Sequence, residues 1–328
     1  MKMVFTELLG SHDRLKEAFP DDELILFDGP LDKEELIDEA QEAELLSVFI
    51  RTPVDEEVID SLPKLSMINT RSVGFDHIDA KHAAERGITV THVPEYGPHV
   101  VAEHAFCLLL ACARNLISAD RSVKDEKKFD FHPFMGVELR NKTLGVLGTG
   151  KIGRESIRIA QGFGMNVVAF DMYPNEDLAR EKGISYHSLE DVLEMSDFVT
   201  IHLPLTDDTH GIIGQRALQS MKNESILVNT ARGPILDEDA LREAVDSGHL
   251  MAAGVDVLSD ELHPDEDPLV NSKKIITTPH IGFYTEEAIG RMLDRAIHTI
   301  TSFQSGELVD KVPMDYSKIV ISSGSGAR

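Results

Sequence analysis

Three charged residues in the second half of the chain have side chains suited to binding a carboxylate and moving a proton: Arg232, Glu261 and His280. The planar guanidinium of Arg232 can bind a carboxylate through two parallel hydrogen bonds, which a lysine cannot do. His280 lies between a proline and an Ile-Gly pair, so its imidazole is expected on a stiff turn, where it can act as an acid or a base. Taken singly, each residue has an ordinary alternative: a surface ion pair, one acid of an acidic loop, and a turn cap. All three follow predicted strands, where ligands of open α/β sheets bind.

A glycine-rich stretch, 143–171, has the pattern of a dinucleotide-binding unit. An apolar run is followed by Gly148, Gly150 and Gly153, then by a segment of helical period and a second apolar run that ends at Asp171. In such a unit the first glycine allows a tight turn, the second lets the backbone approach a pyrophosphate, and the third allows close helix–strand packing. The alternative is a glycine-rich turn in an ordinary α/β unit, but strand, helix and acidic residue all agree with cofactor binding.

The cofactor expected from this stretch is NAD rather than NADP. Asp171 would accept hydrogen bonds from the ribose hydroxyls of the adenosine. The next residues, Met172, Tyr173 and Pro174, supply no cation for a 2′-phosphate, and a carboxylate at close range would repel one.

The elements that must position these residues alternate between short apolar runs and amphipathic segments, which predicts parallel sheets covered on both faces. We expect two doubly wound α/β domains: a Rossmann NAD domain at 98–286, inserted into a smaller flavodoxin-like substrate domain at 1–97 that the segment 287–315 completes. A proline- and glycine-rich linker at 93–98 separates them, and the tail at 316–328 is expected to be disordered. The predicted strands are 3–8, 24–27, 45–50, 67–71 and 89–92 in the first domain and 166–170, 198–202, 225–229, 251–256 and 275–277 in the second.

The helix predicted at 100–116 is apolar on all sides, so either the two domains or a second subunit should cover it. We expect a homodimer built on this helix. Cys107 and Cys112 lie within it at a spacing that suits neither a zinc site nor a redox pair, so buried free thiols are predicted and no metal site is expected. The charged stretch at 121–140 holds three phenylalanines and is expected to form an exposed arm.

The charge balance restricts the partners. The 328 residues include 57 acidic and 32 basic ones, a net charge of −25 at pH 7, which disfavours binding to nucleic acid or to an anionic membrane. A mildly acidic cytosolic enzyme is one interpretation, and a halophilic protein kept soluble by its acidic surface is the other. No apolar run reaches the length of a membrane span and the N-terminus lacks the layout of a signal peptide, so a cytoplasmic location is expected.

Taken together, these motifs resemble the D-isomer-specific 2-hydroxyacid dehydrogenase family over nearly the whole chain, 45–313. The matching segments are R-S-V-G-F-D-H-I-D at 71–79, V-A-E-H at 101–104, G-T-G-K-I-G at 148–153, H-L-P-L-T at 202–206, N-T-A-R-G at 229–233, G-V-D-V at 254–257 and T-P-H-I-G at 278–282. The resemblance implies an NAD-dependent oxidoreductase that transfers a hydride between NADH and a small 2-oxo acid.

The resemblance also implies roles for individual residues. Arg232 would bind the substrate carboxylate and polarise its carbonyl, His280 would donate or accept the proton, and Glu261 would support His280. Relatives commonly have a proline after the catalytic glutamate, whereas Leu262 follows Glu261 here. Cofactor-lining positions are matched by Gly148, Gly150, Lys151, Ile152, Gly153, Asp171, Leu203, Pro204, Thr209, Thr230, Ala231, Arg232, Asp256 and Gly282, with Asp256 near the nicotinamide amide. Substrate positions are matched by Val73, Gly74, Tyr96, Arg232, Phe283 and Tyr284, the amides of Val73 and Gly74 helping to hold the carboxylate.

The substrate branch that the chain resembles is that of the D-lactate dehydrogenases, through Arg71, Tyr96 and the aromatic pair at 283–284. Aromatic walls suit a small or apolar side chain. Arg51 could instead meet a phosphate or second carboxylate, which would indicate 3-phosphoglycerate or hydroxypyruvate, but an exposed loop charge is the favoured interpretation. The enzymatic alternatives are therefore a hydroxypyruvate or glyoxylate reductase and a 3-phosphoglycerate dehydrogenase. A non-enzymatic alternative is an NAD-sensing co-repressor of the C-terminal-binding-protein type, which keeps the same triad; the acidic surface and the lack of an added recognition segment disfavour it.

Overall fold

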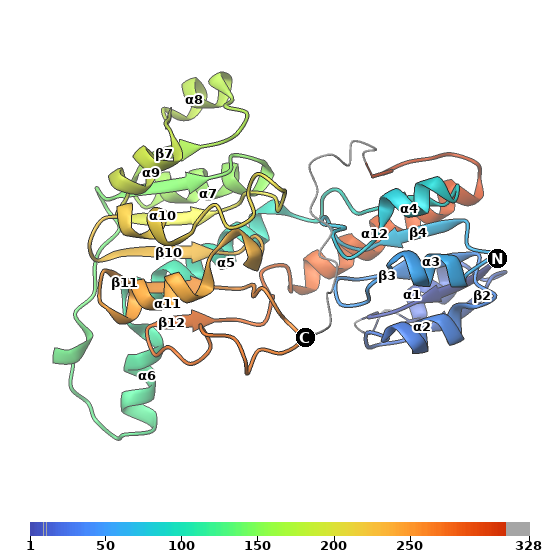
Figure 1. Cartoon of the computed structure of the whole chain (residues 1–328), viewed down its shortest axis with the longest axis horizontal. Helices are drawn as coiled ribbons and strands as arrows, with labels where there is room; N and C mark the ends of the chain where they lie inside the picture. The colour runs from blue at the N-terminus through green and yellow to red at the C-terminus, as the bar shows by residue number, and fades with distance from the viewer. Residues whose placement is uncertain (9, 11, 313–328) are drawn as a thin grey trace. The chain divides into compact units, whose positions relative to one another are not determined.

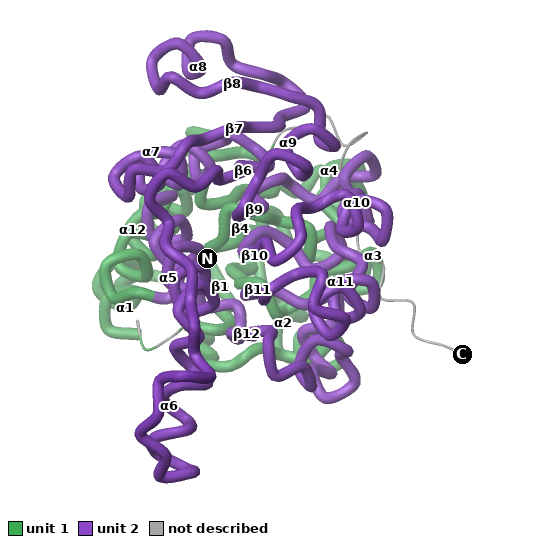
Figure 2. The backbone as a smooth tube through the Cα atoms, turned by 90° about the vertical axis from the view of Figure 1, so that its left-hand side faces the viewer, with its two compact units in different colours: residues 1–97, 285–328 green, residues 98–284 purple. Residues whose placement is uncertain are grey.

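The computed structural model describes residues 1–8, 10 and 12–312 of the chain (Figure 1). They form two compact units, Met1–Gly97 together with the segment that begins at Thr285, and Pro98–Tyr284 (Figure 2). Each unit is built around one parallel sheet, so the predicted α/β class with two parallel-sheet domains is confirmed. The predicted tail at 316–328 and the end of the predicted 287–315 segment lie outside the described residues.

The first unit contains a five-stranded parallel sheet in the order β2-β1-β3-β4-β5, which is the order of flavodoxin-like folds. Its strands are β1 (Lys2–Phe5), β2 (Glu23–Leu26), β3 (Leu45–Val48), β4 (Met67–Thr70) and β5 (Thr89–Thr91). β1 ends before the predicted residue 8, because Glu7 has a φ of +54° and turns the chain out of the strand. The helices are α1 (His12–Ala18), α2 (Lys33–Ala40), α3 (Glu56–Ser61), α4 (Ala80–Glu85) and α12 (Glu286–Gln304).

Both faces of this sheet are apolar, as parallel strands covered by helices require. Alternate strand residues such as Val4, Leu46 and Ile68 pack on one face with side chains of α2, α3 and α4. On the other face Met3, Phe5, Leu45 and Met67 pack with α1 and, through Leu293 and Ile300, with α12. α12, the last described helix of the chain, therefore belongs to the core of the first unit, which begins at the N-terminus of the chain.

The second unit contains a seven-stranded parallel sheet in the order β12-β11-β10-β9-β6-β7-β8. Numbered within the unit, this is the 3-2-1-4-5-6 order of Rossmann folds with a further strand at one edge. The order reverses between β6 (Thr143–Leu147) and β9 (Phe198–Ile201), the place at which such sheets bind ligands. The remaining strands are β7 (Asn166–Phe170), β8 (Ser185–Tyr186), β10 (Ser225–Asn229), β11 (Leu250–Val255) and β12 (Ile275–Thr277).

The apolar helix of the second unit is α5 (Pro98–Ala113), which packs against β10, β11 and α7 (Lys151–Gly162). Most of its apolar side chains are buried there, so the unit itself covers much of the helix. Cys112 is buried as predicted, but Cys107 is exposed, because a spacing of five residues places the two thiols on different sides of a helix. The other helices of this sheet are α8 (Glu176–Lys182), α9 (Leu189–Met195), α10 (Gln215–Ser220) and α11 (Glu238–Asp246).

A short helix, α6 (Leu116–Lys124), follows α5 after Asn115, whose φ of +50° ends the first helix. From α6 to the 3₁₀ turn His132–Phe134 the chain exposes large apolar side chains, including Phe129 at 96%, Phe131 at 80% and Met135, just after the turn, at 85%. Among the residues that the structure describes, no single helix is long and apolar enough to cross a membrane; α5 and α6 reach that length and composition only as a pair bent by 61°.

Candidate active site

The loop after β6 contains three glycines. Close packing requires a glycine at two of these positions, and the third position lies beside open space. Gly148 has a φ of +94°, and a Cβ there would lie 2.7 Å from the carbonyl carbon and oxygen of His202. A Cβ on Gly153 would lie 2.0 Å from the carbonyl oxygen of Gly148. At Gly150 a Cβ would meet no described atom within 4 Å. The loop therefore packs closely at its ends and leaves open space beside Gly150, where α7 begins with its amide groups.

The carboxylate predicted to bind the adenosine ribose is fixed beside this loop. Asp171, at the end of β7, is half-buried and accepts hydrogen bonds from the Thr149 amide (2.6 Å) and hydroxyl (2.8 Å). The Tyr186 hydroxyl of β8 bonds to the same Thr149 hydroxyl (2.7 Å). Burial lowers the pKa of His202, which follows β9, to about 3, and this neutral imidazole bonds to Ser156 of α7 (2.9 Å). These contacts join the ends of β7 and β8 to the glycine loop and the end of β9 to α7.

Arg232 lies on the loop that follows β10. The side chain of Asn229, the last residue of β10, holds the backbone of this loop. The Asn229 side chain accepts a hydrogen bond from the Ala231 amide (3.0 Å) and donates one to the Arg232 carbonyl (2.9 Å). The next residue, Gly233, lies directly against the chain after β11, since a Cβ there would be 2.1 Å from the Leu258 carbonyl carbon. The loop that carries Arg232 and the segment that carries Glu261 are therefore packed backbone to backbone.

Glu261 and His280 form a dyad. The Nδ1 atom of His280 lies 2.9 Å and 3.0 Å from the two carboxylate oxygens of Glu261. Both side chains keep contact with solvent, at 21% and 32% exposure. Because Nδ1 faces the carboxylate, Nε2 is the ring nitrogen left to exchange a proton with another molecule.

The loop that presents His280 is fixed by a buried carboxylate at the end of β11. The two oxygens of Asp256 accept hydrogen bonds from the Ile281 amide (2.9 Å), the Gly282 amide (2.7 Å) and the Thr278 hydroxyl (2.5 Å). His104 of α5 also contacts this carboxylate, with Nε2 at 3.2 Å. Burial alone would raise the pKa of Asp256, but hydrogen bonds from His104, Thr278 and Ile281 outweigh it and hold the pKa below its ordinary value.

The other predicted cofactor positions lie on loops at the same ends of the strands. After β9, the Thr209 hydroxyl donates to the Pro204 carbonyl (2.6 Å) and accepts from the Thr206 amide (2.8 Å), which fixes the turn beyond buried Leu203. After β10, the Thr230 hydroxyl is buried and has no hydrogen-bond partner among the described residues.

The predicted substrate residues belong to both units. Val73, Gly74 and Tyr96 lie in the first unit; Val73 is 41% exposed and the Ser72 hydroxyl donates to the Gly74 carbonyl (2.5 Å). Phe283 and Tyr284 lie in the second, where the Phe283 ring meets the His280 ring edge to face with centroids 6.2 Å apart.

Arg71, a mark of the substrate branch in sequence, is a buried structural residue. Its guanidinium donates to the Ser47 carbonyl (3.0 Å), the Glu7 carbonyl (3.1 Å) and the Thr6 carbonyl. Burial lowers the pKa of Arg71 to about 10, which leaves it charged at neutral pH. Arg71, which precedes the loop that carries Val73 and Gly74, therefore joins the ends of β1, β3 and β4.

Comparison with known proteins identifies the family. The sequence model of the D-isomer specific 2-hydroxyacid dehydrogenase, NAD binding domain, matches residues 106–282. The chain belongs to the D-isomer-specific 2-hydroxyacid dehydrogenases. It is an NAD-dependent oxidoreductase of 2-hydroxy acids, as the sequence motifs predicted.

Relatives of this dehydrogenase are named for three different substrates. It is 38% identical to the glyoxylate reductase of Korarchaeum cryptofilum over 284 residues, 86% of each chain. It is 41% identical to the D-3-phosphoglycerate dehydrogenase of Archaeoglobus fulgidus over 258 residues, 79% of this chain and 49% of that one, so it spans about half the length of that relative. The D-lactate dehydrogenase of Aquifex aeolicus, solved with NAD and lactic acid, superposes with a TM-score of 0.85 at 34% identity, covering 93% of this chain and 96% of that one.

The residues of this dehydrogenase fit the NAD that its family binds. The space beside Gly150 would let a pyrophosphate approach the start of α7, and Asp171 stands at the end of β7 with no lysine or arginine in the three residues that follow it. The buried Thr230 hydroxyl, without a partner in the described chain, is a further group that a bound cofactor could satisfy.

Several residues that shape the site were not singled out from the sequence. The Gly233 contact, the His104 and Thr278 bonds to Asp256, and a carboxyl pair made by Glu238 and Asp267 all join segments far apart in the chain. The short motifs V-A-E-H, N-T-A-R-G and T-P-H-I-G contain His104, Gly233 and Thr278, but a motif does not show which atoms meet, and no motif marked Glu238 or Asp267.

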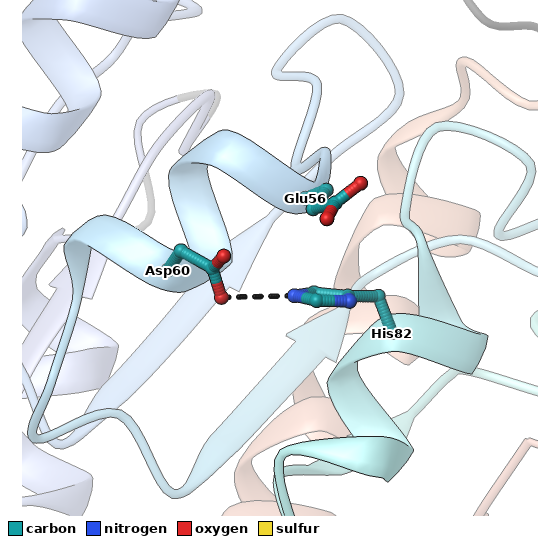
Figure 3. A group of neighbouring side chains, drawn as sticks. All are labelled: Glu56, Asp60 and His82. Atoms are coloured by element: carbon teal, nitrogen blue, oxygen red, sulfur yellow. Dashed lines mark hydrogen bonds and ion pairs between the residues drawn. The ribbon is translucent and has the colours of Figure 1, made fainter.

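A separate cluster in the first unit combines ligand types that bind metals. Side-chain atoms of Glu56 and Asp60 on α3 and of His82 on α4 all lie within 4.8 Å of one another (Figure 3). Asp60 already bonds to His82 (2.9 Å) and to the guanidinium of Arg86. Both bonds go to Oδ1 of Asp60, and the positive charge of Arg86 disfavours a metal cation beside this carboxylate, so we interpret the cluster as an ion-pair network that ties α3 to α4.

Proposed function

We propose that this dehydrogenase reduces a small 2-oxo acid of the pyruvate type with NADH, and oxidises the D-2-hydroxy acid in the reverse direction. The observation that carries the proposal is the Glu261–His280 dyad with the Phe283 ring against His280. An aromatic wall beside the proton donor suits a short aliphatic substituent. Arg51, the candidate ligand for a phosphate or second carboxylate, is exposed, which favours the smaller substrate over phosphoglycerate.

The chain's own residues would divide the work as follows. Arg232 binds the substrate carboxylate and stabilises the charge that develops on the carbonyl oxygen. His280 gives its Nε2 proton to that oxygen during reduction and takes it back during oxidation, while Glu261 steadies the ring through Nδ1. The backbone amides of Val73 and Gly74 bind the same carboxylate. When bound, the nicotinamide supplies or accepts the hydride.

The cofactor would be held along the strand ends of the second unit. The amides of the glycine loop and of Lys151 and Ile152 at the start of α7 would hold the pyrophosphate. Asp171 binds the adenosine ribose, and the turn of Leu203, Pro204 and Thr209 forms one wall. Thr230, Ala231, Asp256 and Gly282 would hold the nicotinamide end.

Three properties of the whole protein belong to the same proposal. The predicted homodimer would use α6 and the arm after it rather than the helix 100–116, because most apolar side chains of that helix are buried within its own unit, whereas Ile117, Phe129 and Phe131 are exposed. The two cysteines of the chain are both free thiols, which suits a cytoplasmic location. The net charge of −25 suits a protein that works at high salt.

The test is loss of NADH absorbance with pyruvate, 2-oxoisocaproate, glyoxylate, hydroxypyruvate and 3-phosphohydroxypyruvate, followed by chiral analysis of the product. We expect the highest kcat/KM with pyruvate or 2-oxoisocaproate and a product of D configuration. Preference for glyoxylate, hydroxypyruvate or its phosphate would overturn the substrate proposal. NADH binding without turnover of any 2-oxo acid would overturn the reductase proposal itself and favour a cofactor-sensing interaction protein.

A further inference from the structure

Behind the segment that carries Glu261, two carboxyl groups meet. Glu238, the first residue of α11, is half-buried, and one of its oxygens accepts a hydrogen bond from the Ser259 amide (2.7 Å). Its side chain is also hydrogen-bonded to that of Asp267. Asp267 is only 6% exposed and accepts a further bond from the Leu269 amide (2.8 Å).

A hydrogen bond between two carboxyl groups needs a proton, because two carboxylates only accept and repel each other. Burial raises the pKa of Glu238 to about 7, and the charge and hydrogen bond of Asp267 act in the same direction. The bond from the Ser259 amide acts against this rise but does not cancel it. Glu238 therefore keeps its proton up to the near-neutral range, and the charge of the pair changes close to pH 7.

The partners of Glu238 lie on either side of Glu261 in the chain. Ser259 precedes it and Asp267 follows it, so one side chain fastens the segment 257–269 at both ends. The same segment lies against Gly233, next to Arg232.

The other charged groups of this segment have different partners or lie in solvent. Asp260 bonds to His263 (2.9 Å) and Glu261 bonds to His280, while Asp265 and Glu266 are exposed. The turn 233–236, between Arg232 and the cap of α11, contributes no charge, and Asp237 and Asp239 beside Glu238 are exposed. Asp267 is therefore the charged group that acts on Glu238.

We propose that Glu238 and Asp267 are positioning residues: as a carboxylic acid–carboxylate pair sharing one proton, they hold the segment 257–269 where Glu261 reaches His280. Loss of the shared proton places two negative charges in contact and releases the segment. The catalytic consequence rests on the proposed function; the structural consequence does not.

Hydrogen–deuterium exchange of the intact protein tests the structural consequence without any turnover. Protection factors, which remove the intrinsic pH dependence of exchange, are compared for residues 257–269 at about pH 6 and about pH 8. We expect wild-type protection to fall several-fold at the higher pH. Glu238→Gln and Asp267→Asn, whose amides keep a donor between the two groups, should hold protection constant. Asp239→Asn, an exposed change of equal charge on the same helix, should behave as wild type.

The activity arm uses the ratio of kcat in Glu238→Gln to kcat in wild type, in which pH effects common to both proteins cancel. We expect a ratio near one at about pH 6 that rises several-fold by about pH 8, with the KM for NADH unchanged. Wild-type protection that does not change with pH, or changes equally in both amide variants, would overturn the proposal. If exchange behaves as expected but no 2-oxo acid is turned over, the proposed function fails and the proton-sharing pair stands.

Discussion

At the scale of single residues, the most informative backbone is that of His280. Its φ of +54° lies in the left-handed region, where a non-glycine residue costs about 1–3 kcal/mol unless its surroundings impose it. Here the amides of Ile281 and Gly282 bond to the Asp256 carboxylate, and the His280 amide bonds to the Asp256 carbonyl (2.8 Å). Asp256 therefore holds the strained turn that orients the His280 imidazole. This role is separate from any contact that Asp256 makes with the cofactor.

Replacing Arg232 by lysine tests the need for a planar fork. Arg232→Lys keeps the charge but loses bidentate binding, so we expect kcat/KM for the 2-oxo acid to fall about 10²- to 10³-fold, with NADH affinity nearly unchanged. Arg216→Lys is the control, because the Arg216 side chain is 94% exposed in the same unit. Equal activity of both variants would show that Arg232 does not bind the substrate carboxylate.

At the scale of elements, the glycine loop permits a paired prediction. Gly153→Ala places a methyl group against the Gly148 carbonyl, so we expect the free energy of unfolding to fall by about 1–3 kcal/mol or more. Gly150→Ala meets open space at a φ of −65°, so stability without cofactor should stay within about 0.5 kcal/mol of wild type, while NADH affinity falls about tenfold or more. Denaturant unfolding and fluorescence titration measure the two quantities. Unchanged NADH affinity in Gly150→Ala would contradict the predicted pyrophosphate site.

The contact between α3 and α4 gives a pH prediction. The hydrogen bond that the His82 ring donates to Asp60 raises the pKa of His82 and lowers the pKa of the Asp60 carboxyl. Stabilisation from the charged imidazole is complete below its unfolded pKa of about 6.5 and is lost as the pH rises through the higher folded value. The melting temperature of His82→Gln should therefore lie below that of wild type at about pH 6, and the two melting temperatures should converge by about pH 8. A difference that is the same at both pH values would exclude this ion pair as its cause.

Apolar runs identified most elements, because parallel strands buried on both faces leave that pattern in the sequence. Strands 225–229 and 275–277 have the predicted bounds. β8 was missed, since Ser185–Tyr186 is too short and polar to produce a run. The break between α5 and α6 was also missed, because Asn115 adopts its left-handed conformation within an otherwise helical pattern. The dyad partners were named from motifs, but the Glu238–Asp267 pair depends on tertiary packing that spacing does not encode.

At the scale of the whole molecule, the net charge of −25 predicts a response to salt. Self-repulsion of the acidic surface weakens as the screening length falls from about 10 Å at 0.1 M to less than about 3 Å above 1 M. We expect the melting temperature to rise between about 0.1 M and about 3 M KCl. A neutral osmolyte at matched osmolality separates charge screening from exclusion at the protein surface. A melting temperature that falls or stays constant in KCl would contradict a halophilic protein.

The central claim is that the Glu261–His280 dyad gives the proton to a 2-oxo acid, and NADH oxidation by dyad variants tests it most directly. General acid catalysis contributes about 10²- to 10⁴-fold, so kcat in His280→Ala should fall by that factor, and kcat in Glu261→Gln by less, with NADH binding retained in both. His210→Ala, which changes an exposed histidine of the same unit, should keep wild-type activity. A His280→Ala variant that reduces the 2-oxo acid at the wild-type rate would contradict the account.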